Sequence, residues 1–337
     1  MMENNYIIFL ITFVISFLGT IYYRSFAIKN NILSNLNFRT LHEKPTPRGG
    51  GVVFSGVFVS MVFLAYFTNK INLELMMVLG VGSGLAATIG YIDDLNGIKP
   101  LNKLFLQIFL ALWILYFFKG GPLINNENFP VWLGWLISLF FLVWLINAYN
   151  FIDGIDGFAI TGAILILTTL ISTLIISNSS SILLLLFPLL LTSCLGFLFF
   201  NWPSASVFMG DSGSIFLGYC FGAFIIYSLL MNEISFYTWL VVFGYYLSDT
   251  SITTITRSIL VKKWYHTHRS HAYQNLARIL NNHSKVTVGV GLFHLFWLLP
   301  LAICTVLMPK FSIIAVFCAY VPSIFWAVKF GPLFSQD

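Results

Sequence analysis

Apolar runs of about twenty residues recur along the whole chain, and they constrain its fold more than any other feature of the sequence. Each run is long enough to cross the hydrocarbon core of a bilayer as a helix. In lipid, only helices and closed barrels satisfy every backbone hydrogen bond. Charged residues make up 9% of the 337 residues, whereas a soluble domain has about 25%. These features predict an all-α polytopic membrane protein and argue against a soluble globular one.

Eleven such runs can be counted, with polar loops between them and no visible soluble domain or internal repeat. The expected spans are 6–23, 51–68, 73–92, 101–118, 131–149, 158–176, 182–200, 213–231, 236–256, 286–306 and 311–329. No Lys or Arg precedes the first run, so we interpret it as the first span and not as a cleaved signal peptide. Residues 1–337 are therefore expected to form one integral membrane domain.

Lys and Arg are distributed unevenly over the loops. Fourteen of the 17 lie in one alternate set of loops, and the other set holds Lys70, Lys119 and Lys310. Because cytoplasmic loops are rich in Lys and Arg, this bias places the N-terminus outside and the C-terminus in the cytoplasm. The bias also accounts for most of the net charge of +5. We therefore expect no nucleic-acid partner.

Six aspartates fall at or near the ends of spans on the basic side. They are Asp93, Asp94, Asp153, Asp156, Asp211 and Asp249. Acidic and basic residues on one face indicate a site for a charged, metal-bound substrate. Simpler interpretations remain open, because Asp156 and Asp211 can serve as helix N-caps. Asp249, which lies inside a span, can instead pair with a Lys or Arg.

Two glycine-rich stretches lie on the same face. In "VFMGDSGSIFLG", residues 207–218, small residues stand where a loop turns into a helix, so its free N–H groups offer a seat for phosphate. Next to them, Asp211 suits Mg²⁺, which prefers oxygen ligands and also binds substrate phosphates. In "KPTPRGGG", residues 44–51, we expect either an irregular loop or a backbone that a ligand approaches closely, with Arg48 as an anion contact.

The last large loop of the basic side reads "RSILVKKWYHTHRSHAYQNLARIL". Its apolar residues Ala272, Leu276, Ile279 and Leu280 recur at helical spacing, which predicts an amphipathic helix at the membrane interface. The histidines form an HxHxxH pattern that could bind zinc. Phosphate contacts by His268 and Arg269 are the preferred interpretation, because no carboxylate is adjacent in sequence.

Four stretches, in this order on alternate loops of the basic side, resemble the polyprenyl-phosphate N-acetylhexosamine-1-phosphate transferases. They are "DDLNGIK", "NAYNFIDGIDG", "VFMGDSGS" and "HTHRSHAYQ". With "LHEKPTPRGGG", the likeness extends from about residue 40 to 280. The family also includes the phospho-MurNAc-pentapeptide transferase and the eukaryotic dolichyl-phosphate enzyme.

The resemblance implies that a lipid phosphate attacks the β-phosphorus of a UDP-sugar and releases UMP. It assigns Asn150 and Asp211 to Mg²⁺, for which Mn²⁺ can substitute, and Phe208 and Asp156 to the uracil site. It implies contacts with the diphosphate or sugar for Lys103, His268 and Arg269. The remaining site residues are Arg48 and Gly210 for substrate binding and Asp93, Asp94, Asp153 and His271 as the catalytic set. The loops expected to build the site are 24–50, 93–100, 150–157, 201–212 and 257–285.

The implied partners are a UDP-HexNAc donor, undecaprenyl phosphate and the lipid bilayer, with a homodimer left open. The implied location is the bacterial cytoplasmic (inner) membrane, with the site facing the cytosol. Gly97 stands where the family often has a third aspartate. "HRSHAYQ" resembles the subgroup that starts O-antigen or capsule chains. The expected donor is therefore GlcNAc or a 6-deoxy sugar such as FucNAc or QuiNAc, with a MurNAc-pentapeptide transferase as the alternative.

Two other classes of membrane protein compete with this interpretation. A secondary transporter places its ionisable residues near the bilayer midplane, often between inverted repeats. Here most of the acids lie at the ends of spans, and no repeat is visible. A CDP-alcohol phosphotransferase needs a DGxxAR motif followed by spaced acids, and "DGIDGFAI" lacks both.

Overall fold

The computed structural model describes residues 5–34, 45–119, 130–260 and 269–333. Its elements are α1 (Tyr6–Lys29), α2 (Gly51–Phe67), α3 (Leu73–Leu75), the π-helix η1 (Met76–Gly82), α4 (Ser83–Asn96), α5 (Pro100–Phe117), α6 (Val131–Phe151), α7 (Phe158–Ile176), α8 (Leu183–Asn201), α9 (Asp211–Leu230), α10 (Phe236–Leu260), α11 (Ala272–Leu280), α12 (His283–Phe293), the π-helix η2 (His294–Leu298), α13 (Leu299–Leu307), the 3₁₀-helix η3 (Pro309–Phe311) and α14 (Ser312–Phe330). Within these ranges, the only extended pairing is an isolated bridge between Leu33 and Pro47. The predicted all-α class is confirmed.

All eleven expected spans are helical. Among the described residues, nine helical segments have the length and apolar character of a membrane span. The other two expected spans are not among these nine. α2 is shorter, with 17 residues, and α10 is more polar, because its 25 residues include Asp249 and several Ser and Thr. α3, η1 and α4 run on as a single span, and so do α12, η2 and α13. The chain is thus a multi-pass membrane protein.

Helix α9 is the centre of the bundle. It packs against α2, α4 and α6, and 83% of its apolar stretch is buried. Two close approaches at its first turn require glycine. A Cβ atom on Gly51 of α2 would lie 2.2 Å from the backbone nitrogen of Gly213, and one on Gly90 of α4 would lie 2.2 Å from the carbonyl oxygen of Asp211. Glycine at these positions therefore lets two helices approach the residue predicted to bind metal.

The π-helix η1 widens the first half of the third span. The indole Nε1 of Trp113 donates to the carbonyl oxygen of Met77 at 2.9 Å, and the hydroxyl of Tyr219 donates to that of Val78 at 3.0 Å. These side chains of α5 and α9 add to the backbone hydrogen bonds of η1 and help to stabilise the irregular turn.

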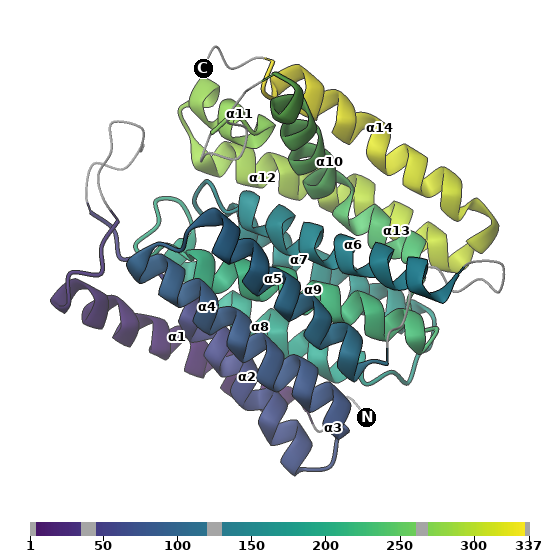
Figure 1. The fold of residues 1–337 in the computed structure, drawn as a ribbon, viewed down its shortest axis with the longest axis horizontal. Helices are drawn as coiled ribbons and strands as arrows, with labels where there is room; N and C mark the ends of the chain where they lie inside the picture. Colours follow the sequence, from purple (N-terminus) through teal and green to yellow (C-terminus); the bar gives the residue numbers. More distant parts are fainter. Residues whose placement is uncertain (1–4, 35–44, 120–129, 261–268, 334–337) are drawn as a thin grey trace.

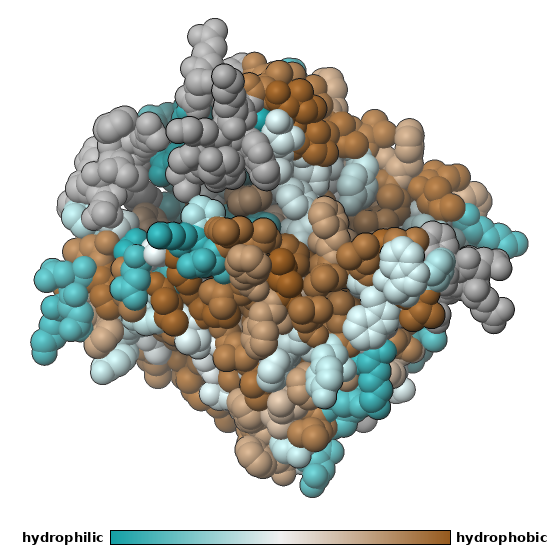
Figure 2. Space-filling view, viewed as in Figure 1, coloured by the Kyte–Doolittle hydropathy of each residue, from teal (hydrophilic) through white to brown (hydrophobic). Residues whose placement is uncertain are grey.

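The loops gather at two opposite ends of the bundle, and the chain begins and ends at different ends (Figure 1). Between them, hydrophobic side chains cover most of the visible face, while hydrophilic ones concentrate toward the ends (Figure 2). Large apolar side chains such as Ile7, Phe140 and Phe317 are well exposed. Such a surface suits a lipid environment.

Candidate functional site

Two loops from the basic side are joined through their backbones. The N–H of Phe208 donates to the carbonyl oxygen of Pro47 at 2.7 Å. In return, the N–H groups of Gly50 and Gly51 donate to the carbonyls of Phe208 and Met209, both at 2.9 Å. The glycines of "KPTPRGGG" therefore allow close contact with another backbone segment of the same chain, at Phe208 and Met209. The hypothesis that they admit a ligand is wrong for Gly50 and Gly51.

Asp94 caps the first turn of α9. Its Oδ1 accepts the N–H of Asp211 and its Oδ2 accepts the N–H of Ser212, both at 3.0 Å. Gly210 precedes the helix with φ +72°, and a Cβ atom there would lie 2.5 Å from the Asp94 carboxylate. The seat for phosphate that "GDSGS" predicted is thus already taken by a carboxylate of the same chain. That expectation is corrected, although Gly210 still borders the cavity described below.

Four side chains from four helices meet beside Asp211. The Lys103 ammonium of α5 lies 2.9 Å from Asp93 Oδ2 and contacts Asp211 Oδ2. The amide nitrogen of Asn150 donates to Asp211 Oδ1 at 2.9 Å and to Ser214 Oγ at 2.8 Å. The two predicted metal ligands, Asn150 and Asp211, are therefore neighbours, and Lys103 lies between them and Asp93.

Asp156 holds two other loops in place. Its Oδ2 accepts the N–H of Ala205 at 3.0 Å and lies 3.4 Å from Nδ1 of His283. It does not cap α7, which begins at Phe158 after Gly157 in a left-handed conformation (φ +70°). The N-cap hypothesis is also wrong for Asp211, because Asp211 is the first residue of α9 and the cap comes from Asp94.

Asn201, the last residue of α8, connects the same loops. Its Oδ1 accepts the N–H of Gly157 at 3.2 Å, and its amide donates to the carbonyl of Val207 at 2.9 Å. It is 3% exposed. The loop that carries Asp153 and Asp156 is thus fixed to the loop that carries Phe208.

Asp153 lies in the loop between α6 and α7. Its pKa is raised well above the ordinary value, first because the carboxyl group is removed from water and then because of the charges of Asp211, Asp94 and Asp156. A contact with the backbone of Gly210 opposes this shift. Asp153 therefore carries a proton more readily than an exposed aspartate does.

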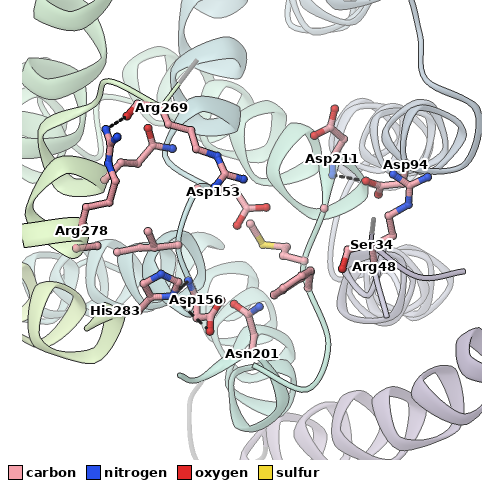
Figure 3. Close-up of a pocket in the computed structure, with 17 residues that line it drawn as sticks. Ser34, Arg48, Asp94, Asp153, Asp156, Asn201, Asp211, Arg269, Arg278 and His283 are labelled. Atoms are coloured by element: carbon pink, nitrogen blue, oxygen red, sulfur yellow. Dashed lines mark hydrogen bonds and ion pairs between the residues drawn. The ribbon is translucent and has the colours of Figure 1, made fainter. Parts of the chain in front are cut away.

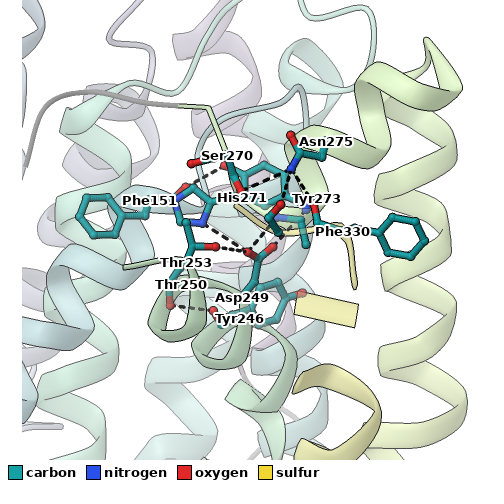
Figure 4. A network of polar contacts seen from close by, with 12 residues as sticks. Phe151, Tyr246, Asp249, Thr250, Thr253, Ser270, His271, Tyr273, Asn275 and Phe330 are labelled. Carbon is teal, nitrogen blue, oxygen red and sulfur yellow. Dashed lines mark hydrogen bonds and ion pairs between the residues drawn. The ribbon is translucent and has the colours of Figure 1, made fainter. Parts of the chain in front are cut away.

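Asp249 caps α11 in the way that Asp94 caps α9 (Figure 4). Its two carboxylate oxygens accept the N–H groups of Ala272 at 3.0 Å and Tyr273 at 3.1 Å, and Nδ1 of His271 lies 3.3 Å away. The Tyr273 hydroxyl donates to the carbonyl of Phe151 at 2.7 Å, which ties α11 to the end of α6. The partner of this intramembrane acid is a helix N-terminus and a histidine, so the hypothesis of pairing with Lys or Arg is wrong.

A cavity of about 410 Å³ opens between these elements, and all five predicted loops contribute to its wall. It is lined by Ser34, Arg48, Asp94, Asp153, Gly154, Ile155, Asp156, Asn201, Phe208, Met209, Gly210, Asp211, Arg269, Gln274, Ala277, Arg278 and His283. In Figure 3, Asp94, Asp211 and Arg48 lie on one side, Arg269, Arg278 and His283 on the other, and Asp153 between them. Positive and negative side chains thus face one shared space.

The other predicted site residues lie around the cavity or outside the described chain. Three of them lie behind Asp211, which lines the cavity. Lys103 and Asn150 contact Asp211 directly, and Asp93 contacts Lys103. His271 is 3% exposed and lies behind the wall, against Asp249. His266 and His268, the first two histidines of the HxHxxH pattern, fall outside the described residues. The predicted amphipathic helix is present as α11, with Ile279 and Leu280 exposed.

Several residues of the wall were not predicted. Asn201, like Asn150, is a polar amide at the end of an apolar run, so the sequence contained a signal for it. Gln274 and Arg278 are four residues apart, on the polar face of the predicted amphipathic helix. Ser34 and His283 carry no comparable signal.

The oxygen donors beside Asp211 are the kind that Mg²⁺ takes. Within the described ranges, no three His, Cys, Asp or Glu side chains converge as a metal cage. Mg²⁺ does not require one, because it is usually held by one or two carboxylates together with water and substrate phosphates. The carboxylates of Asp93 and Asp211 and the amide oxygen of Asn150 therefore fit such an ion.

A polytopic membrane fold with carboxylates and cations around one cavity suits a protein that handles phosphorylated substrates at a membrane. The sequence model described as Glycosyl transferase family 4 matches residues 76–229. A phospho-N-acetylmuramoyl-pentapeptide-transferase of Streptococcus sanguinis (strain SK36) is 30% identical over 231 residues, which cover 62% of this chain and 69% of the relative. A probable undecaprenyl-phosphate N-acetylglucosaminyl 1-phosphate transferase of Bacillus subtilis (strain 168) is 26% identical over 269 residues, or 76% and 74% of the two chains.

A further phospho-N-acetylmuramoyl-pentapeptide-transferase, from Streptococcus uberis, is 35% identical over 196 residues, which cover 53% of this chain and 58% of the relative. The matched region thus spans between about half and three quarters of the length of these curated relatives. It belongs to the polyprenyl-phosphate N-acetylhexosamine-1-phosphate transferase family, within glycosyl transferase family 4. This membership favours a phosphosugar transferase over the transporter and the CDP-alcohol enzyme.

Proposed function

We propose that the protein transfers HexNAc-1-phosphate from a UDP-sugar to undecaprenyl phosphate, with release of UMP. The observation that carries this proposal is the cavity in which Asp94, Asp153, Asp156 and Asp211 face three arginines. The charges suit a diphosphate that needs both cations and a metal. The volume of about 410 Å³ falls within the range of about 300–1,000 Å³ that is usual for small-molecule sites.

Mg²⁺ is the proposed cofactor, held by Asp211 and Asn150, with Mn²⁺ as a substitute. When bound, it neutralises charge on the diphosphate and on the leaving UMP. Arg48, Arg269 and Arg278 are proposed to contact the diphosphate or sugar, since guanidinium groups match phosphate oxygens geometrically. Phe208 and Asp156 are proposed to hold the uracil, together with Asn201.

The acceptor needs orientation more than deprotonation. A phosphate monoester has a second pKa near 6, so it is largely ionised at neutral pH. One of its oxygens forms a bond to the β-phosphorus while the bond between that phosphorus and the oxygen of UMP breaks. Asp93 is proposed to orient the acceptor or to assist the metal, and Asp153, which lines the cavity, is proposed to lie beside the reacting groups.

The expected donor is UDP-GlcNAc or a UDP-linked 6-deoxy-HexNAc, and the product would start a cell-surface polysaccharide. Gln274 is proposed to accept a hydrogen bond from the donor sugar, because its Oε1 is buried in the cavity wall without a hydrogen-bond partner within the described chain. An acetamido N–H or a sugar hydroxyl could fill that place. A MurNAc-pentapeptide donor is the second candidate, supported by the names of the streptococcal relatives.

The test is a panel of UDP donors with purified protein, Mg²⁺ and undecaprenyl phosphate. UDP-GlcNAc, UDP-FucNAc, UDP-QuiNAc and UDP-MurNAc-pentapeptide are compared by UMP release. Asp211→Asn should lower turnover at least about 100-fold, because it weakens the proposed metal site. Detergent gel filtration checks that the variant is folded. If no donor releases UMP, the proposal fails; if Asp211→Asn retains activity, the metal role is withdrawn.

A further inference from the structure

Lys103 occupies a place that suits a metal ion. Its Nζ lies 2.9 Å from Asp93 Oδ2 and 3.4 Å from Asn150 Oδ1, and it contacts Asp211 Oδ2. These oxygens come from α4, α6 and α9, three separate helices. The ammonium group therefore lies within a ring of oxygens that includes both proposed metal ligands.

The ring requires a positive charge. The ammonium contacts both Asp93 Oδ2 and Asp211 Oδ2, so the two carboxylates flank a single cation. Two carboxylates this close repel each other unless a proton or a cation lies between them. Lys103 supplies that cation, and its Nζ is largely shielded, with a side chain 18% exposed. A divalent ion on the same oxygens would compete with the ammonium for the same space.

The side chain of Lys103 can leave this place without unfolding the helix. Lys103 is the fourth residue of α5, so it lies at the edge of the bundle beside Asp211, which borders the cavity. Its four-carbon stem is flexible, and its ammonium is a point charge without fixed geometry. A diphosphate in the cavity would offer the ammonium a new set of oxygens.

We propose that Lys103 is an internal counter-ion that divalent metal and donor displace together. In the absence of ligand, the ammonium holds the carboxylates of Asp93 and Asp211. When metal binds to Asp211 and Asn150, the ammonium moves to the diphosphate of the donor. This inference rests on the proposed function, and it makes metal and nucleotide binding mutually dependent, since a coupling between two sites is reciprocal.

The test measures Mn²⁺ affinity by electron paramagnetic resonance on the full-length protein in nanodiscs, with and without UDP. UDP carries the uridine and diphosphate that all candidate donors share, and it cannot transfer a sugar. After correction for the Mn²⁺–UDP complex, UDP should tighten Mn²⁺ binding by about 5- to 150-fold, the usual range for coupled sites.

Lys103→Met should bind Mn²⁺ without UDP more tightly than wild type does, and UDP should then tighten the binding by a smaller factor, because only its direct contact with the metal remains. Lys99→Met is the matched control. It removes the same charge one helical turn earlier, from an exposed residue at the start of α5, and should behave as wild type.

Two results would overturn the inference. One is a Lys103→Met variant whose UDP-free affinity for Mn²⁺ equals that of wild type or is weaker. The other is a wild-type affinity that UDP does not change, which decides the matter even if Lys103→Met does not fold. If wild type releases UMP from a donor but shows either result, only this inference fails. If wild type binds no Mn²⁺ under any condition, the proposed metal site fails with it.

Discussion

The carboxylates of Asp94 and Asp153 border the same cavity but have different surroundings. Asp94 accepts two backbone N–H groups of α9, so its negative charge is matched by the helix N-terminus. Asp153 faces the charges of three other aspartates, and its pKa is raised. At the scale of single residues, Asp94 therefore has backbone donors for its carboxylate, whereas the fold disfavours the anion of Asp153.

The raised pKa of Asp153 predicts a pH dependence of stability. The folded pKa of Asp153 lies above the unfolded value of about 3.9, so between the two values only the folded chain retains the proton. Stability should fall as pH rises through this window and level off above the folded pKa. Asp153→Asn removes this loss, so it should unfold at a higher temperature than wild type at pH 8 without divalent ions.

The measurement is thermal unfolding of the metal-free protein in detergent from pH 4 to 8. Glu74→Gln is a suitable control, because it removes one charge from a pair with Lys119 that is largely exposed. Its unfolding temperature should follow that of wild type at every pH. An Asp153→Asn variant less stable than wild type at pH 8 would contradict the prediction.

At the scale of elements, two helices begin on a carboxylate from an earlier helix. Asp94 of α4 caps α9, and Asp249 of α10 caps α11. α11 in turn presents Gln274, Ala277 and Arg278 to the cavity. The two caps thus set the orientation of two of the elements that form its wall.

Asp249→Asn should loosen α11. An amide keeps one acceptor oxygen but places a donor opposite a backbone N–H, so we expect a loss of about 1–3 kcal/mol in the free energy of unfolding. The KM for the donor should rise several-fold, with a smaller change in kcat, because Asp249 lies behind the cavity wall. Steady-state kinetics and thermal unfolding check both effects.

Asn72→Ala is the matched control for this variant. Asn72 caps α3 by accepting the N–H of Leu75 at 2.9 Å, at the opposite end of the bundle. Its loss should lower stability by about 1 kcal/mol and leave the KM for the donor unchanged. Equal KM values for wild type and Asp249→Asn would count against a positioning role.

The helices were predictable from the sequence because lipid forces each apolar run to close its own backbone hydrogen bonds. The predicted spans agree with the helices to within a few residues at most ends, although α10 continues to Leu260 and α1 to Lys29. The π-helix η1 was not predictable, because it depends on Trp113 and Tyr219 from other helices. The hydropathy of a segment depends only on its own residues, so it does not indicate partners on other helices.

The site was predictable in part for a related reason. Charged residues at the ends of apolar runs are rare enough to attract notice, which identified Asp94, Asp153, Asp156 and Asp211. What each carboxylate contacts was not predictable, since Asp94 and Ser212 are 118 residues apart in the chain. Arg278 and His283 were missed because basic residues in a basic loop do not stand out.

At the scale of the whole molecule, the contacts at the end opposite the cavity follow the predicted sidedness. Lys70 donates to Asn5 at 3.0 Å, and Ser181 donates to Glu233 at 2.5 Å. All four residues belong to loops or loop edges expected outside. The cavity draws its residues from the other set of loops.

This sidedness predicts a membrane orientation with the cavity in the cytoplasm. Alkaline phosphatase fused after Lys119 should be active, and the same enzyme fused after Lys285 should be inactive, because it folds only outside the cytoplasmic membrane. Green fluorescent protein fused after Asp337 should fluoresce. The reverse pattern would place the cavity on the side opposite to that of the cytosolic nucleotide sugars.

The two borrowed caps also bear on biosynthesis. In both pairs, the carboxylate is translated before the helix that needs it: Asp94 is made well before α9, and Asp249 before α11. Each later helix can therefore find its acceptor already present in the nascent bundle when its own first turn forms. The chain thus carries a direction of assembly, in which the earlier helices, including α4 and α10, form a template on which the last wall of the cavity is completed.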